Sequence, residues 1–554
     1  MECVTTVSYS LTLNGGLTKP FPAKRGLRQG DPMSPYLFVI AMEYLQREMS
    51  TLAKQKEFRY HPKCKKLGVT HICFADDLLM FCKGDKKSIT VLQNIFNKFS
   101  KASGLQASAE KSSIYIAGVS QHTKEELIQL TGYAEGSIPF KYLGVPLSAR
   151  KLNIHQCLPL VEKITERIRC WSARMLSYSG RVQLIKSVLF GVQTYWAQIF
   201  LIPKKIMKMI ETLCRTFLWT GSNEFSRKAL IAWDKICQPK SAGGLNVMNM
   251  RIWNKAAVLK HLWVLAMKKD SLWIKWAHTN YIKRKQIEET PTPKAAAWVV
   301  RKIMDARDEV MEMRTDQQRI TVILENFMKQ GKFHIHKAYI QMQPQFSKVE
   351  WKSIHMHSQI HPRFKFHMWL AINQRIATVD RLIKFGIQVQ TECIFCGKAE
   401  ENFEHLYFGC QNTRELWDRI LKWLGHTRQI GDWSQELNWM NNIAKKKEYK
   451  AEMTVASFAM VMYCIWRERN SMRFNKGRYN IDEVCREVAM HIHIQGRKKI
   501  KWKKGSGSSF WTATVGFPGA IFSPGTHEMS GKGRGNSDPT GSQGREKPRN
   551  KRGG

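Results

Sequence analysis

The stretch HICFADDLLMFCK, residues 71–83, places two adjacent carboxylates, Asp76 and Asp77, between two apolar runs. Short apolar runs around a polar pair are typical of a β-hairpin, whose tight turn would present both carboxylates at one end of a small sheet. Paired carboxylates at such a turn can bind Mg²⁺, because this hard cation prefers oxygen ligands and also binds substrate phosphates. The alternative is a polar turn without a metal, since Asp-Asp pairs are common.

Upstream of this stretch, residues 26–45 (GLRQGDPMSPYLFVIAMEYL) combine polar loop residues with the start of a helix. Arg28 and Gln29 supply hydrogen-bond donors for phosphates and for base or sugar edges, and Gly30 allows a ligand to approach the backbone closely. The prolines that follow fit a loop that opens a helix. By themselves these residues indicate little more than a helix start.

The composition of the whole chain favours a large intracellular protein that binds a polyanion. The 554 residues are 43% hydrophobic, enough for roughly three or four domains with buried cores. Lys and Arg number 88 against 45 Asp and Glu, a net charge of +43, and nucleic acid is the usual partner of such a field. The longest strongly apolar stretch, Val455 to Trp466, is too short to span a membrane. The N-terminal residues are not typical of a signal peptide.

The sequence pattern changes several times along the chain. Residues 1–150 mix alternating apolar runs with short helical patterns, which predicts an α+β region. From residue 151 to 315 the pattern is helical and basic; for any one helix, an ordinary solvated face is the alternative interpretation. The segment Thr290–Lys294 (TPTPK) predicts a linker, and the composition beyond Gly505 predicts disorder.

A second cluster of chemically distinctive residues is Cys393-x2-Cys396-x8-His405-x4-Cys410. Three thiolates and one imidazole suit tetrahedral Zn²⁺, and four protein ligands leave no open position for catalysis, so the zinc would be structural. The alternatives are a chance cluster and a redox Cys-x-x-Cys pair. The chain has 13 cysteines, an odd number that argues against a secreted disulfide framework.

Aromatic residues upstream are expected to pack around this site: Phe364, Phe366 and Trp369. Basic residues nearby are candidates for facing nucleic acid: Arg363, Lys365, Arg375 and Arg381.

Taken in order, these motifs resemble the reverse transcriptases of non-LTR (LINE-type) retrotransposons as found in plants. The resemblance runs through RQGDPMSP (28–35), FADD (74–77), ASGLQASAEKS (102–112), FKYLGVPL (140–147), WSARMLSYSGRVQLIKSVL (171–189), HMWLAINQRIATVDRL (367–382), CIFCGKAEENFEHLYFGC (393–410) and IWRERNSMRF (465–474). It covers most of residues 1–475, and the ordered set is much more specific than any one motif.

The resemblance implies a right-hand polymerase palm in which Asp76 and Asp77 are catalytic and hold Mg²⁺. It also implies residues that bind the template, the primer or the incoming nucleotide: Arg28, Gln29, Gly30, Lys111 and Gly144. In the motif that contains Lys111, Ser108 stands where the family often has Asn. The Cys393 to Cys410 cluster matches the zinc-binding module that follows the polymerase in plant elements.

One departure concerns the third metal-binding Asp of the family's palm, which lies on a strand before the CVTTVSYS segment, residues 3–10. This sequence has no Asp before Asp31. We therefore expect a partial palm that lacks the fingers and the first palm strand, with an incomplete two-ion Mg²⁺ site and impaired activity.

The expected fold is α+β for the palm and mainly α for the rest. The expected organisation is a partial reverse transcriptase palm (1–150), a basic helical thumb or connection region (151–315), a connector (316–359), a CCHC-type zinc-binding domain (360–425), a helical C-terminal region (426–504) and a disordered basic tail (505–554).

The expected function is that of an RNA-directed DNA polymerase. It would transfer a nucleotide from a deoxynucleoside triphosphate to a DNA primer on an RNA template, and so hold an RNA–DNA hybrid. Because the primer of such elements is expected to be nicked chromosomal DNA, the protein would work in the nucleus. A non-catalytic nucleic-acid-binding zinc protein derived from a retrotransposon is the alternative. A structural helical protein whose charge is incidental is a third hypothesis.

Overall fold

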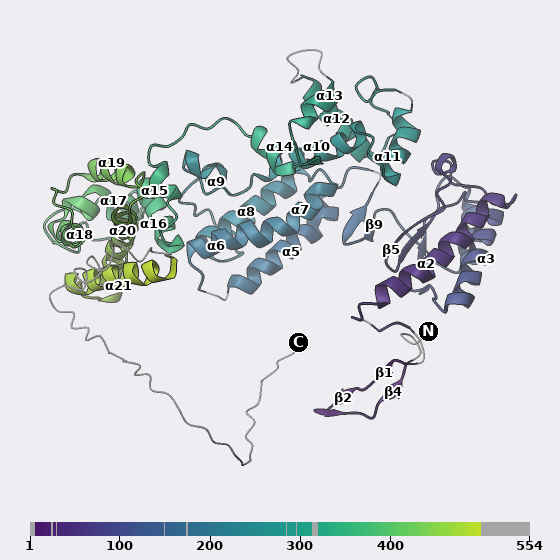
Figure 1. Ribbon diagram of the computed structural model, residues 1–554, viewed down its shortest axis with the longest axis horizontal. Coiled ribbons are helices and arrows are strands. Elements are labelled where there is room, and N and C mark those ends of the chain that lie inside the picture. The colour runs from purple at the N-terminus through teal and green to yellow at the C-terminus, as the bar shows by residue number, and fades with distance from the viewer. Residues whose placement is uncertain are drawn as a thin grey trace, which may run out of the picture.

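The computed structural model describes residues 6–23, 26–28, 30–148, 150–172, 175–283, 285–294, 296–312 and 319–499. Gln29 and the predicted tail from residue 505 onward lie outside the described residues. The described chain is a mixed α and β structure, rich in helix, whose strands form small two-stranded sheets. Figure 1 shows the N-terminal elements at one end, α5 to α8 in the middle and the C-terminal helices at the other end.

The N-terminal region combines short strands with three longer helices. Its elements are β1 (Ser8–Tyr9), β2 (Thr12–Leu13), β3 (Gly16–Leu17), β4 (Phe21–Pro22), α2 (Ser34–Ser50), η1 (Thr51–Lys54), η2 (Lys65–Leu67), β5 (His71–Phe74), β6 (Asp77–Met80), α3 (Lys86–Ser103), β7 (Ser113–Ile114), α4 (Gln121–Thr131), β8 (Ala134–Glu135), β9 (Phe140–Tyr142) and β10 (Val145–Leu147). Antiparallel pairs join β1 to β4, β2 to β3, β5 to β6 and β9 to β10, whereas β7 and β8 are parallel.

Helices α2 and α3 enclose a small core in this region. Helix α3 begins where the Asp85 carboxylate accepts a hydrogen bond from the Ser88 amide, and it ends at Gly104 in the left-handed conformation. Its apolar residues recur at helical spacing and pack against Leu45 and Met49 of α2. This core supports the β5–β6 hairpin from behind, since Leu78 and Met80 pack against it.

The middle of the chain is helical. Its elements are α5 (Ile154–Ser172), α6 (Tyr178–Leu184), η3 (Ile185–Leu189), α7 (Phe190–Ile199), α8 (Lys204–Thr220), α9 (Trp233–Cys237), η4 (Lys240–Ala242), α10 (Met250–Ala266), α11 (Leu272–Ala277), η5 (His278–Ile282), α12 (Trp298–Glu312), α13 (Ile320–Glu325), β11 (Met328–Lys329), β12 (Lys332–Phe333) and α14 (Ile335–Gln341), with β11 and β12 paired antiparallel.

One core holds together the elements from α10 to α14. It includes Ile287 on one side of the Thr290–Lys294 segment and Ile303 on the other. This proline-rich segment, predicted as a linker, therefore does not separate two cores. Its composition was misleading because the Thr290 side chain is buried and the prolines form a loop packed on helix α12.

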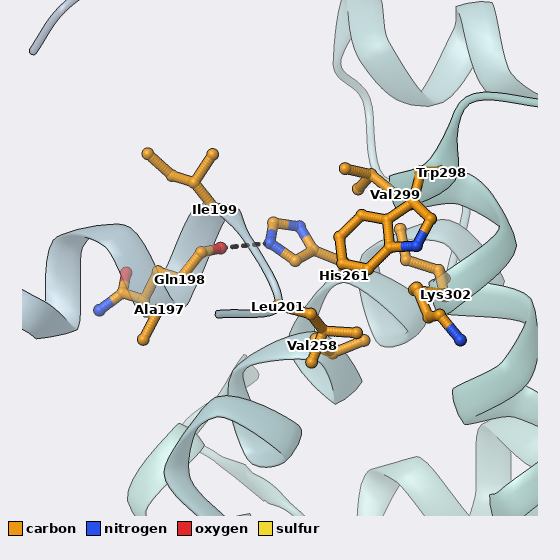
Figure 2. A pocket seen from close by; sticks show the side chains of 10 residues that line it. Ala197, Gln198, Ile199, Leu201, Val258, His261, Trp298, Val299 and Lys302 are labelled. Atoms are coloured by element: carbon orange, nitrogen blue, oxygen red, sulfur yellow. Dashed lines mark hydrogen bonds between the residues drawn. The ribbon is translucent and has the colours of Figure 1, made fainter. Parts of the chain in front are cut away.

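Helices α7, α10 and α12 meet around a cavity of only about 10 Å³. Figure 2 shows the His261 ring of α10 directed at the backbone carbonyl of Gln198, with a nitrogen to oxygen distance of 2.5 Å. Burial lowers the pKa of this histidine. Because such a volume holds one water at most, we interpret the cavity as a packing gap and not as a ligand site.

The C-terminal helices share a large core with α5 to α8. They are α15 (Lys352–Met356), α16 (Pro362–Ile372), α17 (Val379–Lys384), η6 (His405–Gly409), α18 (Gln411–Trp423), α19 (Trp433–Ile443), α20 (Tyr449–Asn475) and α21 (Ile481–Lys499). The prediction that Phe364, Phe366 and Trp369 are core residues is confirmed. Phe366 stacks on Tyr178 of α6, and the Trp369 indole donates to the Gly243 carbonyl at 2.7 Å. None of the described helices has the length and apolarity needed to cross a membrane.

Candidate metal sites

The predicted hairpin around Asp76 and Asp77 is confirmed. Strands β5 and β6 are antiparallel, with Phe74 opposite Asp77, so Ala75 and Asp76 form a two-residue turn. Ala75 has a φ of 51°, a left-handed conformation that costs a residue other than glycine about 1 kcal/mol. Both carboxylates are exposed at the tip of the hairpin. The turn therefore presents them to solvent from the end of the strand pair.

A second hairpin, β9–β10, contains the predicted residue Gly144 in its turn. The pKa of Tyr142 on β9 is raised by burial and then by the negative charges of Asp77 and Cys73. The pKa of Cys73 is itself raised, by burial first and by Asp76 and Asp77 next. The Tyr142 side chain is therefore within range of the charge on Asp77.

The other predicted substrate-binding residues lie at exposed turns. The Arg28 carbonyl accepts a hydrogen bond of 2.7 Å from the Ser34 hydroxyl, which stabilises the turn before α2, and Gly30 in this turn has a φ of 89°. Lys111 lies in an exposed turn after α3. Within the described ranges, neither the Arg28 nor the Lys111 side chain forms a hydrogen bond or ion pair with the Asp pair. No third His, Cys, Asp or Glu among the described residues joins Asp76 and Asp77 in a group that could hold a metal ion.

The four residues of the predicted zinc site come together. Their ligand atoms, from Cys393, Cys396, His405 and Cys410, all lie within 4.8 Å of one another. The Cys393 and Cys410 sulfurs are 3.9 Å apart, and the Cys396 sulfur is 3.3 Å from His405 Nε2. Since Zn–S bonds of about 2.3 Å put two thiolates of a tetrahedron about 3.8 Å apart, the spacing suits one Zn²⁺.

Local turns bring these ligands together. Gly397 has a φ of 61° and donates its amide to the Cys393 carbonyl at 2.8 Å, which closes the turn between the first two cysteines. His405 begins the π-helical turn η6, and Cys410 precedes the first residue of α18. The Cys410 amide returns to the His405 carbonyl at 2.6 Å. The x2, x8 and x4 spacings therefore correspond to one turn, one loop and one helical turn.

The environment favours a thiolate at Cys410. The pKa of Cys410 is lowered, first by the hydrogen bond from the Cys393 thiol and also by the backbone amides of Asn412 and Thr413, whereas the same hydrogen bond raises the pKa of Cys393. These amides belong to the N-terminal turn of α18, where unpaired N–H groups stabilise negative charge. Cys393 and Cys410 are fully buried, so the site is closed to solvent on their side.

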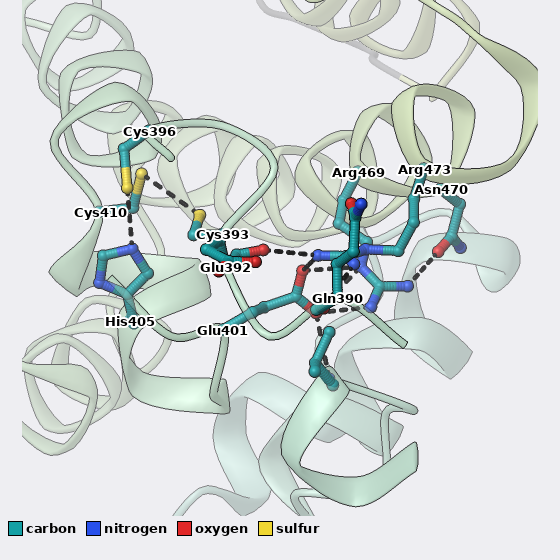
Figure 3. A network of polar contacts seen from close by, with 11 residues as sticks. Gln390, Glu392, Cys393, Cys396, Glu401, His405, Cys410, Arg469, Asn470 and Arg473 are labelled. Atoms are coloured by element: carbon teal, nitrogen blue, oxygen red, sulfur yellow. Dashed lines mark hydrogen bonds and ion pairs between the residues drawn. The ribbon is translucent and has the colours of Figure 1, made fainter. Parts of the chain in front are cut away.

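A buried ion network adjoins this cysteine cluster (Figure 3). The Glu401 carboxylate is fully buried and accepts hydrogen bonds from the Arg469 guanidinium, at 2.5 Å for the shortest, and from Arg473 at 2.9 Å. Arg473 also donates to the carbonyls of Gln390 and Glu392, each at 2.9 Å. The turn that holds Cys393 is therefore fastened to helix α20 through its backbone and through Glu401.

Two segments of the chain match known protein families. Residues 1–147 match the family described as reverse transcriptase (RNA-dependent DNA polymerase), and residues 333–417 match the family described as zinc-binding in reverse transcriptase. The Asp hairpin falls within the first segment, and all four cysteine-cluster ligands fall within the second.

Relatives of these reverse-transcriptase segments come from mobile elements and from plants. A 129-residue stretch, 23% of this chain and 21% of the relative, is 33% identical to a protein of Arabidopsis thaliana named as a ribonuclease H protein. A type-1 retrotransposable element R2 Pol polyprotein of Popillia japonica is 24% identical over 35% of this chain and 32% of its own length. Transposon TX1 of Xenopus laevis encodes an uncharacterized 149 kDa protein that is 27% identical over 40% of this chain and 16% of that protein. The chain thus spans a third or less of these relatives.

The ion network of Glu401, Arg469 and Arg473 was not predicted from the sequence. The available signal was two arginines, Arg469 and Arg473, four residues apart in the polar end of a long helical run whose earlier part is apolar. Arginines on a helix face that packs against the protein require buried hydrogen-bond acceptors. The acceptor here, Glu401, is 68 positions away from Arg469 in the sequence. No local pattern connects the two.

Basic residues beside the zinc-binding segment have intramolecular partners. The Lys365 ammonium donates to the His357 carbonyl at 2.5 Å, and Arg381 donates to the Gln374 carbonyl at 2.9 Å. The Arg363 guanidinium lies over the Tyr463 ring, 4.7 Å from its centre, whereas Arg375 is exposed. A role for these residues in binding nucleic acid stays a prediction.

Replacing Glu401 by glutamine is expected to lower the free energy of unfolding by about 3 kcal/mol, because two buried guanidinium groups lose their only carboxylate partner in this network. Urea denaturation measures the change, and metal analysis should still find zinc, since the four ligands are intact. Glu400→Gln is the matched control, because this neighbouring side chain is exposed. Equal stability of the two variants would show that the network does not hold the turn.

Proposed function

We propose that this chain is part of an RNA-directed DNA polymerase of a LINE-type retrotransposon, of the kind found in plants. The observation that carries the proposal is the Asp76–Asp77 turn, which lies at the tip of a tight hairpin inside the segment that matches the reverse transcriptase family. The β9–β10 hairpin supports it, because its Tyr142 is within range of the charge on Asp77 and the same hairpin contains Gly144, a residue proposed to position the primer. The reaction is transfer of a nucleotide from a deoxynucleoside triphosphate to a primer 3′-hydroxyl.

In this proposal residues 1–150 form part of a polymerase palm, and Asp76 and Asp77 hold Mg²⁺. Their exposed carboxylate oxygens are the donors that this ion prefers. When bound, Mg²⁺ would activate the 3′-hydroxyl and stabilise the leaving pyrophosphate. The residues proposed to position the template, the primer and the nucleotide are Arg28, Gln29, Gly30, Lys111 and Gly144.

The remainder of the chain would hold the nucleic acid. The basic helices from residue 151 to 315 would act as a thumb, and the zinc bound by the cysteine cluster would have a structural role. An RNA template paired with a DNA primer is the proposed ligand. Nicked chromosomal DNA as primer would place the reaction in the nucleus.

Binding of an RNA–DNA hybrid should fall steeply as salt rises and should depend little on sequence. The reason is the net charge of +43, because each phosphate that a lysine or arginine neutralises releases counterions. If about six phosphates are contacted, the affinity falls about a thousandfold between about 50 and 200 mM salt. Fluorescence anisotropy with two hybrids of unrelated sequence measures this dependence. An affinity that is the same across that range of salt would contradict the proposal.

The proposed catalytic role of the two carboxylates is tested by RNA-templated primer extension with Asp76→Ala and Asp77→Ala variants.

A further inference from the structure

A basic groove of about 760 Å³ lies between the N-terminal region and the middle of the chain. One wall contains Lys66 of η2, and the opposite wall is formed by η5, by Lys283 and Lys285, and by the loop of residues 290–293. Three exposed lysines line it, Lys66, Lys283 and Lys285, together with Tyr281. No carboxylate side chain is among its described lining residues. The groove therefore has the electrostatics of a site for an anion.

The two walls are joined at Lys63. Its backbone carbonyl accepts hydrogen bonds from the Trp276 indole at 3.0 Å and from the Asn280 amide at 3.3 Å. Its ammonium lies 3.4 Å from the Tyr281 hydroxyl. These contacts connect segments that are more than 200 positions apart, so the width of the groove depends on specific contacts between the two regions.

The loop on the second wall is held from behind by Arg307 of α12. This arginine is buried and donates to the carbonyl of Ile287 at 2.9 Å and also to the carbonyl of Thr290. Thr290 and Ile287 are themselves buried, which fixes the backbone on either side of the groove's rim. The lysines that precede this loop thus project from an anchored backbone.

Lys283 has an unusual backbone. It directly follows the π-helical turn η5 and has a φ of 59° with a ψ of −125°, a region that favours glycine. A lysine in this conformation costs stability, and residues held in such strain are concentrated at functional sites. The presence of a lysine in this strained conformation is consistent with a ligand that binds its ammonium group.

We infer that this groove binds the phosphate backbone of the nucleic acid that extends away from the Asp76–Asp77 turn. The inference rests on the proposed function. Lys66 and Asp76 are ten residues apart, so their Cα atoms are separated by at most about 35 Å. Because successive nucleotides advance about 3.4 Å along a duplex, the groove lies within about ten steps of the proposed primer end. Cations on both walls of an open groove suit an extended polyanion better than a small enclosed anion.

The test compares hybrids of two lengths, one of about six base pairs and one of about twenty. At about 3.4 Å per base pair the longer hybrid exceeds the upper limit of about 35 Å on the separation, so it can span from the Asp pair across the groove, whereas the shorter covers only about 20 Å. In the triple variant Lys66→Glu, Lys283→Glu and Lys285→Glu, affinity for the long hybrid should fall about tenfold or more at 0.1 M salt. The salt slope should drop by about one for each lysine that contacts a phosphate. Affinity for the short hybrid should fall by a smaller factor, because fewer of its phosphates can lie in the groove.

A charge-matched control carries Lys445→Glu, Lys446→Glu and Lys447→Glu, three exposed lysines between α19 and α20. This control should keep the affinity for the long hybrid within about twofold. A single variant, Lys283→Gly, removes one cation and relieves the backbone strain, so its loss of affinity cannot come from unfolding. It should be at least as stable as the parent chain in urea and should lower the salt slope by about one.

Three results would overturn the inference. The groove variant could bind the long hybrid as the parent does, the control could lose as much affinity as the groove variant, or the short hybrid could lose as much as the long one. In each case the parent chain still binds hybrid, and the proposed function stands. If the parent chain binds neither hybrid at low salt, the proposed function fails together with the inference.

Discussion

Replacing Cys396 by serine is expected to abolish stoichiometric zinc and to destabilise the segment from residue 391 to 410. Structural zinc contributes on the order of 10 kcal/mol to small sites, and a serine hydroxyl is a poor replacement for a thiolate ligand. Cys393 and Cys410 are part of the large core that also contains α20. We therefore expect the zinc loop to lose its order while α20 keeps enough buried apolar surface to remain helical.

Metal analysis, urea denaturation and hydrogen exchange measure this effect. The matched control is Cys464→Ser, which alters another buried cysteine of the same core that lies on α20 and outside the cluster. The control should lose some stability through a buried hydroxyl but retain one zinc ion per chain. If Cys396→Ser retains its zinc and its exchange protection, the four residues are not a metal site.

The second large effect concerns catalysis. The chain is expected to bind an RNA–DNA primer–template and to extend the primer about a thousandfold more slowly than a reverse transcriptase with a complete metal site. Asp76 and Asp77 supply two carboxylates, and no third acidic residue joins them among the described residues. Positioning and charge stabilisation are most of what catalyses this transfer, and a loss of about 4 kcal/mol of transition-state stabilisation slows a reaction about a thousandfold.

The control for this expectation is the affinity for primer–template. It should be the same in the parent chain and in Asp76→Ala and Asp77→Ala variants, because phosphate contacts elsewhere provide most of the binding. A slow rate with intact affinity separates a defect in the metal site from a defect in nucleic-acid binding. Weak binding in the parent chain would assign the slow rate to binding instead.

Short sequence spacings predicted the hairpin around the Asp pair and the clustering of the four Cys and His residues, because the geometry of both is local. The hairpin around Asp76 needs only two short apolar runs and a turn, and the cluster from Cys393 to Cys410 folds through consecutive turns. In both cases the ligands are close in sequence. Backbone geometry alone then limits how far apart they can lie.

Contacts between distant segments could not be predicted in this way. The pairing of Glu401 with Arg469 and the docking of Lys63 on Trp276 depend on how whole helices pack, and no window of sequence contains both partners. For the Thr290–Lys294 segment, the sequence predicted a linker, whereas the structure has one core on both sides of it. Its prolines favour a loop, but only the buried Arg307 behind it shows that the loop is part of a core.

The most direct test of the proposed catalytic role of Asp76 and Asp77 is RNA-templated primer extension by the chain with Mg²⁺. The reaction is followed over hours and compared with the Asp76→Ala and Asp77→Ala variants. We expect slow incorporation that follows the RNA template and disappears in both variants, while their affinity for the hybrid is unchanged. Incorporation at the same rate in the variants would contradict the assignment of the Asp pair as the catalytic carboxylates. Fast synthesis by the parent chain would contradict the expectation that its metal site is incomplete.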